Sequence, residues 1–181
     1  QFKGYLVPID QMGGVQINFP NLVKITPFNN KLDYENYLMR LDAFPEFMDQ
    51  IIALMKEGIK DGLIPPQIVL RTVPEQIDAQ IVQVEESPFY KPFLEFPDDM
   101  TDADCLRLTK SGTETIEKSV ISSYKKLKDY FKTDYLPFCS EEISILSMPK
   151  GGEWYKYLVN MYTTTDLTPK GIHELGLREV R

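Results

Sequence analysis

The pair His173-Glu174 is the part of the sequence closest to a known catalytic motif. In the motif H-E-x-x-H on a helix, two histidines on one face bind zinc and the glutamate serves as the base. Here Leu177 takes the place of the second histidine, and His173 is the only histidine in the chain. One copy of this chain therefore cannot form a site with two histidine ligands. We interpret His173 as a histidine near a helix start, and we assign no catalytic and no metal-binding residue.

Four aspartates form the densest group of carboxylates, namely Asp98, Asp99, Asp102 and Asp104. Oxygen-rich loops bind hard cations such as calcium, but the glycine and the terminal bidentate glutamate of such a loop are missing here. Thr101 followed by Asp102 and Asp104 is instead typical of a helix start, where side-chain oxygens and negative charge satisfy free amides and the positive end of the helix dipole. The aspartates therefore predict a solvated acidic helix start.

Nucleophilic catalysis and nucleotide binding have no support in the sequence. A serine triad needs a histidine base, which only His173 could supply, and no serine lies in a G-x-S-x-G motif. The glycine pairs Gly13-Gly14 and Gly151-Gly152 fit neither the P-loop pattern nor the dinucleotide-binding pattern.

Cys105 and Cys139 are the only cysteines, and they lack the C-x-x-C spacing of zinc or redox sites. We expect two ordinary buried thiols. A disulfide stays open as an alternative, although the two residues flank one predicted helical segment from opposite ends, which argues against contact.

The stretch GGEWYKYLVNMYTTTDLTP combines aromatic rings with hydroxyl groups, which suits a binding surface. Gly152 permits a close backbone approach. The candidate substrate-binding residues are Gly152, Trp154, Tyr155, Tyr157, Thr163, Thr164 and Thr165. One helical face also collects four apolar residues, which are Trp154, Tyr157, Leu158 and Met161. Such a face is equally typical of a buried core, so both interpretations stay open.

The charge balance argues against nucleic acid as a partner. The chain has 20 Lys and Arg against 27 Asp and Glu, which gives a net charge of −7. Nucleic acid would be repelled by this charge. The densest basic group lies among acidic residues, as in a solvated helix face, and consists of Lys118, Lys125, Lys126 and Lys128.

The two ends of the sequence indicate a piece of a longer protein. Gln1 leads directly into an apolar segment without an initiator Met, and the final GIHELGLREVR reads as an unfinished helix. No stretch reaches the roughly 18 apolar residues of a spanning helix. The start also lacks the basic region and apolar run of a signal peptide. We therefore expect no membrane span and no signal peptide in this chain.

Hydrophobic periodicity predicts a mainly α fold, a helical bundle with a short β-strand or hairpin element and ordered loops rich in proline and aromatic residues. Residues 1–181 form a single helical domain in this prediction. Residues 1–31 are an irregular arm, residues 32–137 are the helical bundle, and residues 138–181 are a strand, a turn, a helix and the start of a truncated helix.

Three apolar stripes define the predicted bundle. The first is interrupted at Pro45 and closed by Gly62, which predicts one helix or a kinked pair. The second contains Pro74, which suits an early helical turn. The third follows the helix start at Thr101 and ends near Pro137. Its apolar residues are Ile116, Val120, Tyr124, Leu127 and Phe131.

Outside the stripes, local patterns predict three further features. The segment SPFYKPFLEFP should be an ordered loop held by its aromatic rings. Weak period-two character from Ile143 to Met148 predicts a strand. Thr168 before Pro169 is typical of a helix cap followed by the first helical residue.

Five segments resemble the bacterial domain-of-unknown-function family 885. They are QMGG, NYLMRLDAFPEFMDQIIALMKEGIKDGLIPPQIVL, SPFYKPF, SYKKLKDYFKTDYLPF and MPKGGEWYKYLVNMYTTTDLTPKGIHELGLREV. The last segment is the most specific, and the likeness covers nearly the whole chain. One departure is Gly171, where the family usually has an acidic residue that could complete a capping box. This departure should weaken the start of the last helix slightly.

The resemblance implies a catalytic centre outside this chain. Members of that family are similar in layout to helical zinc peptidases, are often exported or lipid-anchored, and carry an H-E-x-x-P-G-H signature followed by E-G-W-A-L-Y. Neither signature occurs in these residues. The resemblance thus implies a longer parent in the cell envelope or periplasm, a hydrolase-like protein whose missing C-terminal half supplies the zinc site.

Two functional hypotheses follow. In the first, the chain is a non-catalytic fragment of a metal-dependent peptidase and forms one wall of its substrate cleft. The fragment alone is inactive. Its partners are a peptide substrate and the missing half of the same protein. The alternative is a helical binding or interaction domain without enzymatic activity. A third interpretation, scaffold only, would be favoured by high burial of Trp154 and Tyr155.

Overall fold

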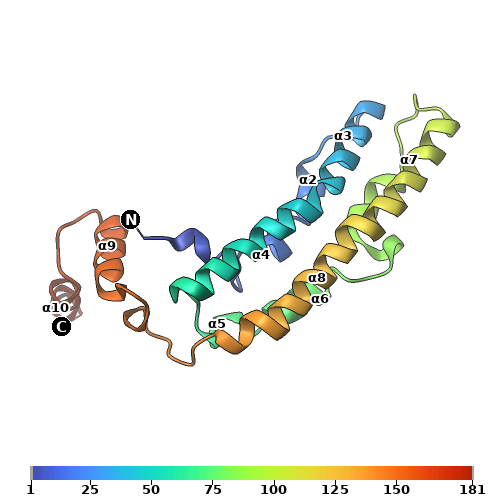
Figure 1. The fold of residues 1–181 in the computed structure, drawn as a ribbon. Coiled ribbons are helices and arrows are strands. Elements are labelled where there is room, and N and C mark those ends of the chain that lie inside the picture. Colours follow the sequence, from blue (N-terminus) through green and yellow to red (C-terminus); the bar gives the residue numbers. More distant parts are fainter. Residues whose placement is uncertain (1, 181) are drawn as a thin grey trace.

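The computed structural model describes residues 2–180 and consists of helices joined by loops (Figure 1). The longer helices are α3 (Lys31–Asp42), α4 (Phe44–Asp61), α7 (Asp102–Thr115), α8 (Ser122–Tyr130), α9 (Gly151–Thr163) and α10 (Pro169–Glu179). The shorter α-helices are α1 (Val15–Asn18), α2 (Leu22–Ile25), α5 (Gln67–Leu70) and α6 (Val73–Asp78). The 3₁₀ helices are η1 (Gly4–Leu6), η2 (Val84–Glu86), η3 (Pro88–Phe93), η6 (Leu136–Phe138) and η7 (Ile145–Ser147), and the π-helices are η4 (Ile116–Ile121) and η5 (Phe131–Tyr135). The predicted mainly α fold is confirmed.

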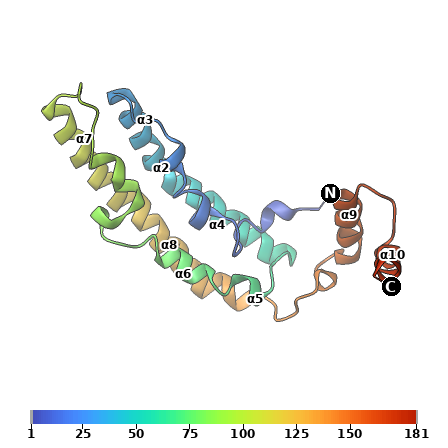
Figure 2. The same ribbon diagram turned by 180° about the vertical axis from the view of Figure 1, so that it is seen from behind.

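Two long helical rods form the body of the molecule (Figures 1 and 2). The first rod is α3 and α4, and the second is the continuous run from α7 through η4 and α8 to η5. Because α3 packs on α7 while α4 packs on α8, the two rods run in the same direction. The segment that connects the first rod to the second in the sequence runs back along the second rod. Its helix α6 contacts α8, and its helix η3 contacts α7. In residues 2–180, no helix is long and apolar enough to cross a membrane.

The helix boundaries follow from capping and from residues with special backbone geometry. The hydroxyl oxygen of Thr101 accepts a hydrogen bond from the backbone N–H of Asp104 at 3.2 Å, which caps α7. Pro45 and Pro74 lie in the first turns of α4 and α6, where an N–H would have no helical partner. Gly62 ends α4 in the left-handed conformation with φ 70°. The predictions at Thr101, Pro74 and Gly62 are confirmed. Of the two alternatives at Pro45, one helix or a kinked pair, the structure has the pair α3 and α4.

Hydrogen-bonded tyrosines fix the loops on the rods. Tyr37 Oη donates to the carbonyl of Phe89 at 3.0 Å, and Tyr124 Oη donates to the carbonyl of Val15 at 3.1 Å. Burial raises the pKa of both phenols above the ordinary value, so both remain donors. The carbonyl of Phe89 belongs to the proline-rich loop, the segment SPFYKPFLEFP that contains η3, and the carbonyl of Val15 belongs to the N-terminal arm. One buried bond therefore holds each of these segments in place.

The N-terminal arm contains η1, α1 and α2 and contributes to the core. Its η1 packs on α4, its α1 on α6 and its α2 on η3. The buried residues of the arm are Leu6, Ile9, Val15 and Gln16. At Gly14, φ is 119°, a conformation that favours glycine, and an added Cβ would lie 3.1 Å from both the Cα atom of Ile9 and the carbonyl oxygen of Pro8.

The predicted strand from Ile143 to Met148 is wrong, because these residues contain the 3₁₀ turn η7. The hydroxyl oxygen of Ser144 accepts a hydrogen bond from the N–H of Leu146 at 3.2 Å and turns the chain. A strand also needs a neighbour for its backbone hydrogen bonds. Residues 2–180 contain no β-strand, and their only strand-like pairing is an isolated bridge between Pro66 and Ser140.

Both cysteines are free thiols, so the disulfide alternative does not occur. Cys139 is buried, and burial raises the pKa of its thiol to about 11. Cys105 is only partly buried. The expectation of a buried thiol therefore holds fully for Cys139 alone.

Candidate functional site

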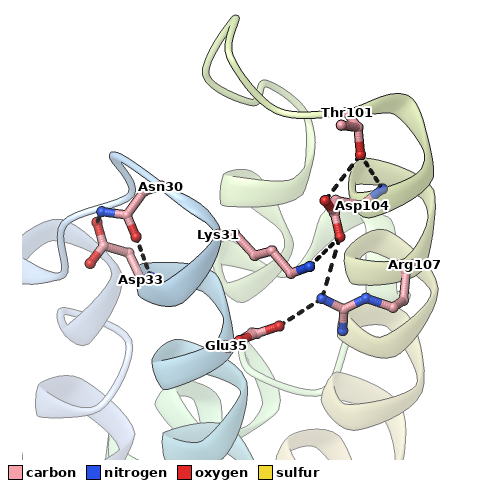
Figure 3. Close-up of polar contacts among 7 residues, drawn as sticks. All are labelled: Asn30, Lys31, Asp33, Glu35, Thr101, Asp104 and Arg107. Atoms are coloured by element: carbon pink, nitrogen blue, oxygen red, sulfur yellow. Dashed lines mark hydrogen bonds and ion pairs between the residues drawn. The ribbon is translucent and has the colours of Figure 1, made fainter.

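A network of charged side chains joins the starts of α3 and α7 (Figure 3). Lys31 Nζ lies 2.6 Å from Asp104 Oδ1, and Thr101 Oγ1 donates to Asp104 Oδ2 at 3.0 Å. Arg107 Nη2 lies 2.7 Å from Glu35 Oε1 and 3.8 Å from Asp104 Oδ1. The hydrogen bonds from Lys31 and Thr101 lower the pKa of the Asp104 carboxyl. Asp104 is therefore held in its ionised form between two cations.

This network links two helices and does not form a metal site. The other three aspartates of the cluster, Asp98, Asp99 and Asp102, are exposed. The carboxylate of Asp104 is already neutralised by Lys31 and Arg107. In the part of the chain that the structure describes, no group of three or more His, Cys, Asp or Glu residues is placed to hold a metal ion.

His173 lies exposed on α10. The helix start is as predicted, because Thr168 Oγ1 accepts a hydrogen bond from the N–H of Gly171 at 3.1 Å. The neighbour Glu174 lies 3.8 Å from the ammonium of Lys170. His173 and Glu174 both lie on the exposed face of α10, and among residues 2–180 no group of three potential metal ligands includes them.

The last two helices and the loop before them carry an unusual share of exposed apolar side chains. They hold half of the large exposed hydrophobic residues in residues 2–180, namely Ile143, Leu146, Tyr155, Tyr157, Met161, Tyr162, Leu167, Leu175, Leu177 and Val180. Exposed apolar groups mark binding surfaces where they form one continuous patch. Trp154 is only half-buried and Tyr155 is 43% exposed, which does not favour a purely internal role.

Trp154 separates two grooves at the junction of α9 with the rods. The smaller groove, of about 260 Å³, is lined by Phe2, Lys3, Asp61, Leu63, Pro149, Lys150 and Trp154. The larger, of about 390 Å³, lies between the N-terminal segment, the start of α5 and the loop of residues 140–148. The Phe2 ring stacks on Trp154 with a centroid separation of 5.8 Å and an interplanar angle of 8°. We call these two grooves the Trp154 grooves.

The seven candidate residues do not form one compact surface. Side chains rotate by about 100° per residue on a helix, so Tyr155 and Tyr157 point about 200° apart. Tyr157 lies on the side of Phe2, with ring centroids 5.4 Å apart. Gly152 and Thr164 are separated by about 18 Å along the helix axis. Only Trp154, among the seven, lines the Trp154 grooves.

The three threonines stabilise the end of α9. Thr163 Oγ1 donates to the carbonyl of Val159 at 2.8 Å. Thr164 has φ 54° and ends the helix in the left-handed conformation. The carbonyl of Thr165 accepts a hydrogen bond from Asn160 Nδ2 at 2.8 Å. These polar groups are therefore used within the chain at the end of α9 opposite to Trp154.

The close backbone approach expected at Gly152 occurs at Gly151. A Cβ on Gly151 would collide with the carbonyl oxygen of Ile145, whereas the nearest atom to a Cβ on Gly152 is Leu146 Cδ2 at 3.9 Å. Gly151 therefore lets η7 pack directly on the start of α9. Gly152 is exposed and free of this constraint.

Sequence reasoning missed the residues that bring α9 against the rods. Lys3 Nζ donates to Asp61 Oδ2 at 2.7 Å, which fixes the N-terminal segment at the end of α4 and places Phe2 on Trp154. Lys150 lies beside them with φ 57°. The contacts join positions far apart in the sequence, and the aromatic residue at position 2 was the only local signal.

Comparison with known proteins identifies the family and the fold. The family described as "Bacterial protein of unknown function (DUF885)" matches residues 2–181. Among solved structures, "the putative lipoprotein from Colwellia psychrerythraea" is similar, with a TM-score of 0.87 and 21% sequence identity over 96% of this chain. At this identity the likeness establishes the fold alone. The match covers 30% of the length of that protein. No curated protein matches the sequence.

Proposed function

The chain belongs to the DUF885 family of bacterial proteins of unknown function, and we propose that it is a non-catalytic part of a longer metal-dependent peptidase. In this proposal, α9 forms one wall of the cleft that binds peptide substrates. Trp154 and Tyr157, which both contact the Phe2 ring, supply the aromatic contacts, whereas Tyr155 points away from them. Gly152 leaves room at the start of α9, and the threonines Thr163 to Thr165 hold its other end.

The observation that carries this proposal is the position of Trp154 between two grooves. A half-buried tryptophan flanked by concave surfaces can bury large apolar area and still donate a hydrogen bond from its indole N–H. Concave, mostly apolar surfaces with a few polar groups are typical of ligand sites. A peptide supplies both apolar side chains and backbone acceptors to such a wall.

The residues of this chain do not fit a zinc site. Its only histidine lies exposed on α10, and among residues 2–180 no three potential ligands lie together. The proposal therefore places the zinc in a part of the longer protein outside these residues. The match to 30% of a solved protein supports a longer parent. The contribution of this chain is to bind and orient the substrate.

The test is a side-by-side measurement of zinc content and peptide hydrolysis for this chain and for its longer parent. We expect about one zinc per molecule and hydrolysis in the long form, and neither in the short form, because coordination needs at least three protein ligands that converge on the ion. A long form without zinc and without hydrolysis would contradict the peptidase proposal. Stoichiometric zinc in this chain alone would contradict its non-catalytic role.

A second candidate function is a helical interaction domain without enzymatic activity. It is favoured by the exposed apolar residues of α10, because Leu175, Leu177 and Val180 are 38%, 44% and 84% exposed and line neither of the Trp154 grooves. Such a surface suits a protein partner. This candidate predicts that the long form binds a protein partner through α10 while lacking zinc. Loss of that binding after Leu175→Ser with unchanged folding would support it.

For the longer parent we propose a location in the cell envelope. The support is that the solved protein with the same fold is described as a "putative lipoprotein". Cell fractionation of the tagged parent tests this directly. Recovery in the soluble cytoplasmic fraction would contradict it.

A further inference from the structure

A separate apolar groove lies between the N-terminal arm and the first rod. It has a volume of about 540 Å³ and is formed by α1, α2 and the facing sides of α3 and α4. Its apolar lining includes Phe19, Leu22, Ile25, Phe47 and Ile51. Ile25 is 79% exposed and Phe47 is 45% exposed. Large apolar side chains therefore face solvent beside a concave surface. We call it the Arg40 groove, for the charged residue in its lining.

Among residues 2–180, Arg40 is the only charged residue that lines this groove. Within residues 2–180 its guanidinium has no carboxylate at ion-pair distance, and its one hydrogen bond is a long one of 3.5 Å to Thr26 Oγ1. Four other grooves of the molecule each have at least one carboxylate in the lining. These carboxylates include Glu141, Asp61, Asp78 and Asp10, one in each groove. In a chain with a net charge of −7, the Arg40 groove is thus distinguished by an uncompensated cation.

Two amides lie along the same groove, and one of them is free to form hydrogen bonds with a ligand. The side chain of Asn18 is exposed and makes no hydrogen bond to any residue from 2 to 180. Asn21 is held in place, because its Nδ2 donates to the carbonyl of Ile17 at 3.0 Å and its Oδ1 accepts from Lys24 Nζ at 3.0 Å. A peptide can use a free amide beside an apolar floor, whereas an acyl chain has polar atoms only at one end.

We propose that the Arg40 groove binds the carboxyl end of an apolar peptide. The carboxylate pairs with the Arg40 guanidinium, for which two parallel N–H···O bonds are the favoured geometry. The apolar side chains of the peptide lie on Phe19 and Phe47, and the Asn18 amide bonds to its backbone. This proposal does not rest on the peptidase hypothesis, because the Arg40 groove and the Trp154 grooves have no lining residue in common.

The test is a titration of the ¹⁵N-labelled chain with acetyl-leucyl-leucyl-phenylalanine, followed by NMR. The C-terminal amide of the same peptide removes only the charge, and decanoate replaces the peptide by an acyl chain. Arg40→Gln removes the cation. The matched control is Arg71→Gln, which removes an arginine from another groove, one that also contains Glu141. Arg40 is exposed and forms no ion pair within residues 2–180, so the variant should fold, and its near-ultraviolet circular dichroism verifies this.

We expect the peptide acid to shift the amide signals of Asn18, Arg40 and Phe47 and to leave Trp154 fluorescence unchanged. Both the peptide amide and Arg40→Gln should weaken binding about tenfold or more, the value for a hydrogen bond to a charged group, and Arg71→Gln should not. Equal binding of acid and amide, shifts confined to other surfaces, or no binding would overturn the proposal. Decanoate that binds as tightly at the same amides would replace the peptide by a fatty carboxylate and would overturn it as well.

Discussion

Replacing Gly112 with alanine tests how the second rod packs on the proline-rich loop. Gly112 is a buried residue in the interior of α7. Alanine favours a helix over glycine by about 1 kcal/mol, so the substitution would stabilise a site with free space. At Gly112 there is none. An added Cβ would lie 2.5 Å from both Cε2 and Cζ of the Phe93 ring.

The magnitude depends on whether the ring can move away. Phe93 is only 4% exposed, and its ring lies 6.0 Å from that of Tyr34 and 6.1 Å from that of Tyr37, measured between centroids. Both tyrosines are fixed in the core. Overpacking a filled core typically costs about 1–3 kcal/mol, and a Cβ that lies 2.5 Å from two ring atoms belongs in the upper part of that range, at about 2–3 kcal/mol. The gain in helix propensity of about 1 kcal/mol is subtracted from this cost. We expect Gly112→Ala to lower the free energy of unfolding by about 1–2 kcal/mol.

Urea denaturation followed by circular dichroism measures this change. Gly176→Ala is the matched control, because within residues 2–180 no atom other than those of its chain neighbours and its own helix backbone lies within 4 Å of the added Cβ, and it should not destabilise the chain. Phe93→Leu combined with Gly112→Ala should be less destabilised than the sum of the two single variants, since the smaller side chain makes room for the methyl group. A Gly112→Ala variant as stable as the parent chain, or more stable, would refute the described packing of Phe93 on α7.

Three further predictions concern charge, the junction of α9 and the thiols. The pKa of Asp104 is lowered in the folded chain, so its ion pairs stabilise the fold above the ordinary aspartate pKa, and this stabilisation is lost as the pH falls through the pKa of the folded chain. Asp104→Asn should therefore make the free energy of unfolding depend less on pH on the acid side. An unchanged pH dependence would contradict this. Phe2→Ala should shift the fluorescence of Trp154, the only tryptophan, to longer wavelength, because the stacked ring no longer shields the indole; an unchanged spectrum would contradict the stacking. Cys139, with its pKa raised by burial to about 11, should react with a thiol reagent at pH 8 much more slowly than Cys105, and equal rates would contradict its burial.

Helix boundaries could be predicted because they depend on neighbouring residues. Thr101, Pro45 and Gly62 act through their own hydroxyl, ring or backbone geometry, and each lies where it was expected. The strand predicted for Ile143–Met148 is wrong because a local interaction of another kind decides the structure there. A local hydrogen bond from the N–H of Leu146 to the Ser144 side chain competes with extended structure, and a weak period of two cannot reveal it.

The π-helical segments of the second rod had a signal in the sequence. The five stripe residues from Ile116 to Phe131 are buried. Their average spacing is about 3.75 residues, which is longer than the 3.6 residues per turn of an α-helix. A wider turn keeps such a stripe on one face, which is where η4 and η5 occur. The longer spacing therefore indicates π-helical turns, but only once it is known that the first rod packs on this stripe.

The candidate site could be predicted only in part. Trp154 and its aromatic neighbours stood out by composition, and they do lie on a largely exposed helix. The grooves beside Trp154 depend on Phe2 and Asp61, which reach it through folding and not through sequence spacing. The same limit applies to the Arg40 groove, whose lining comes from four helices.

The most direct test of the central claim is a kinetic comparison of two variants in the longer parent. Trp154→Ala removes the residue between the two grooves, and Tyr162→Ala removes an exposed aromatic residue of the same helix that lines neither groove. If α9 lines the substrate cleft, Trp154→Ala should raise KM for peptides about tenfold or more with kcat little changed, and Tyr162→Ala should change neither. Unchanged KM for Trp154→Ala in a zinc-loaded, active parent would contradict the assignment of α9 as a wall of the cleft.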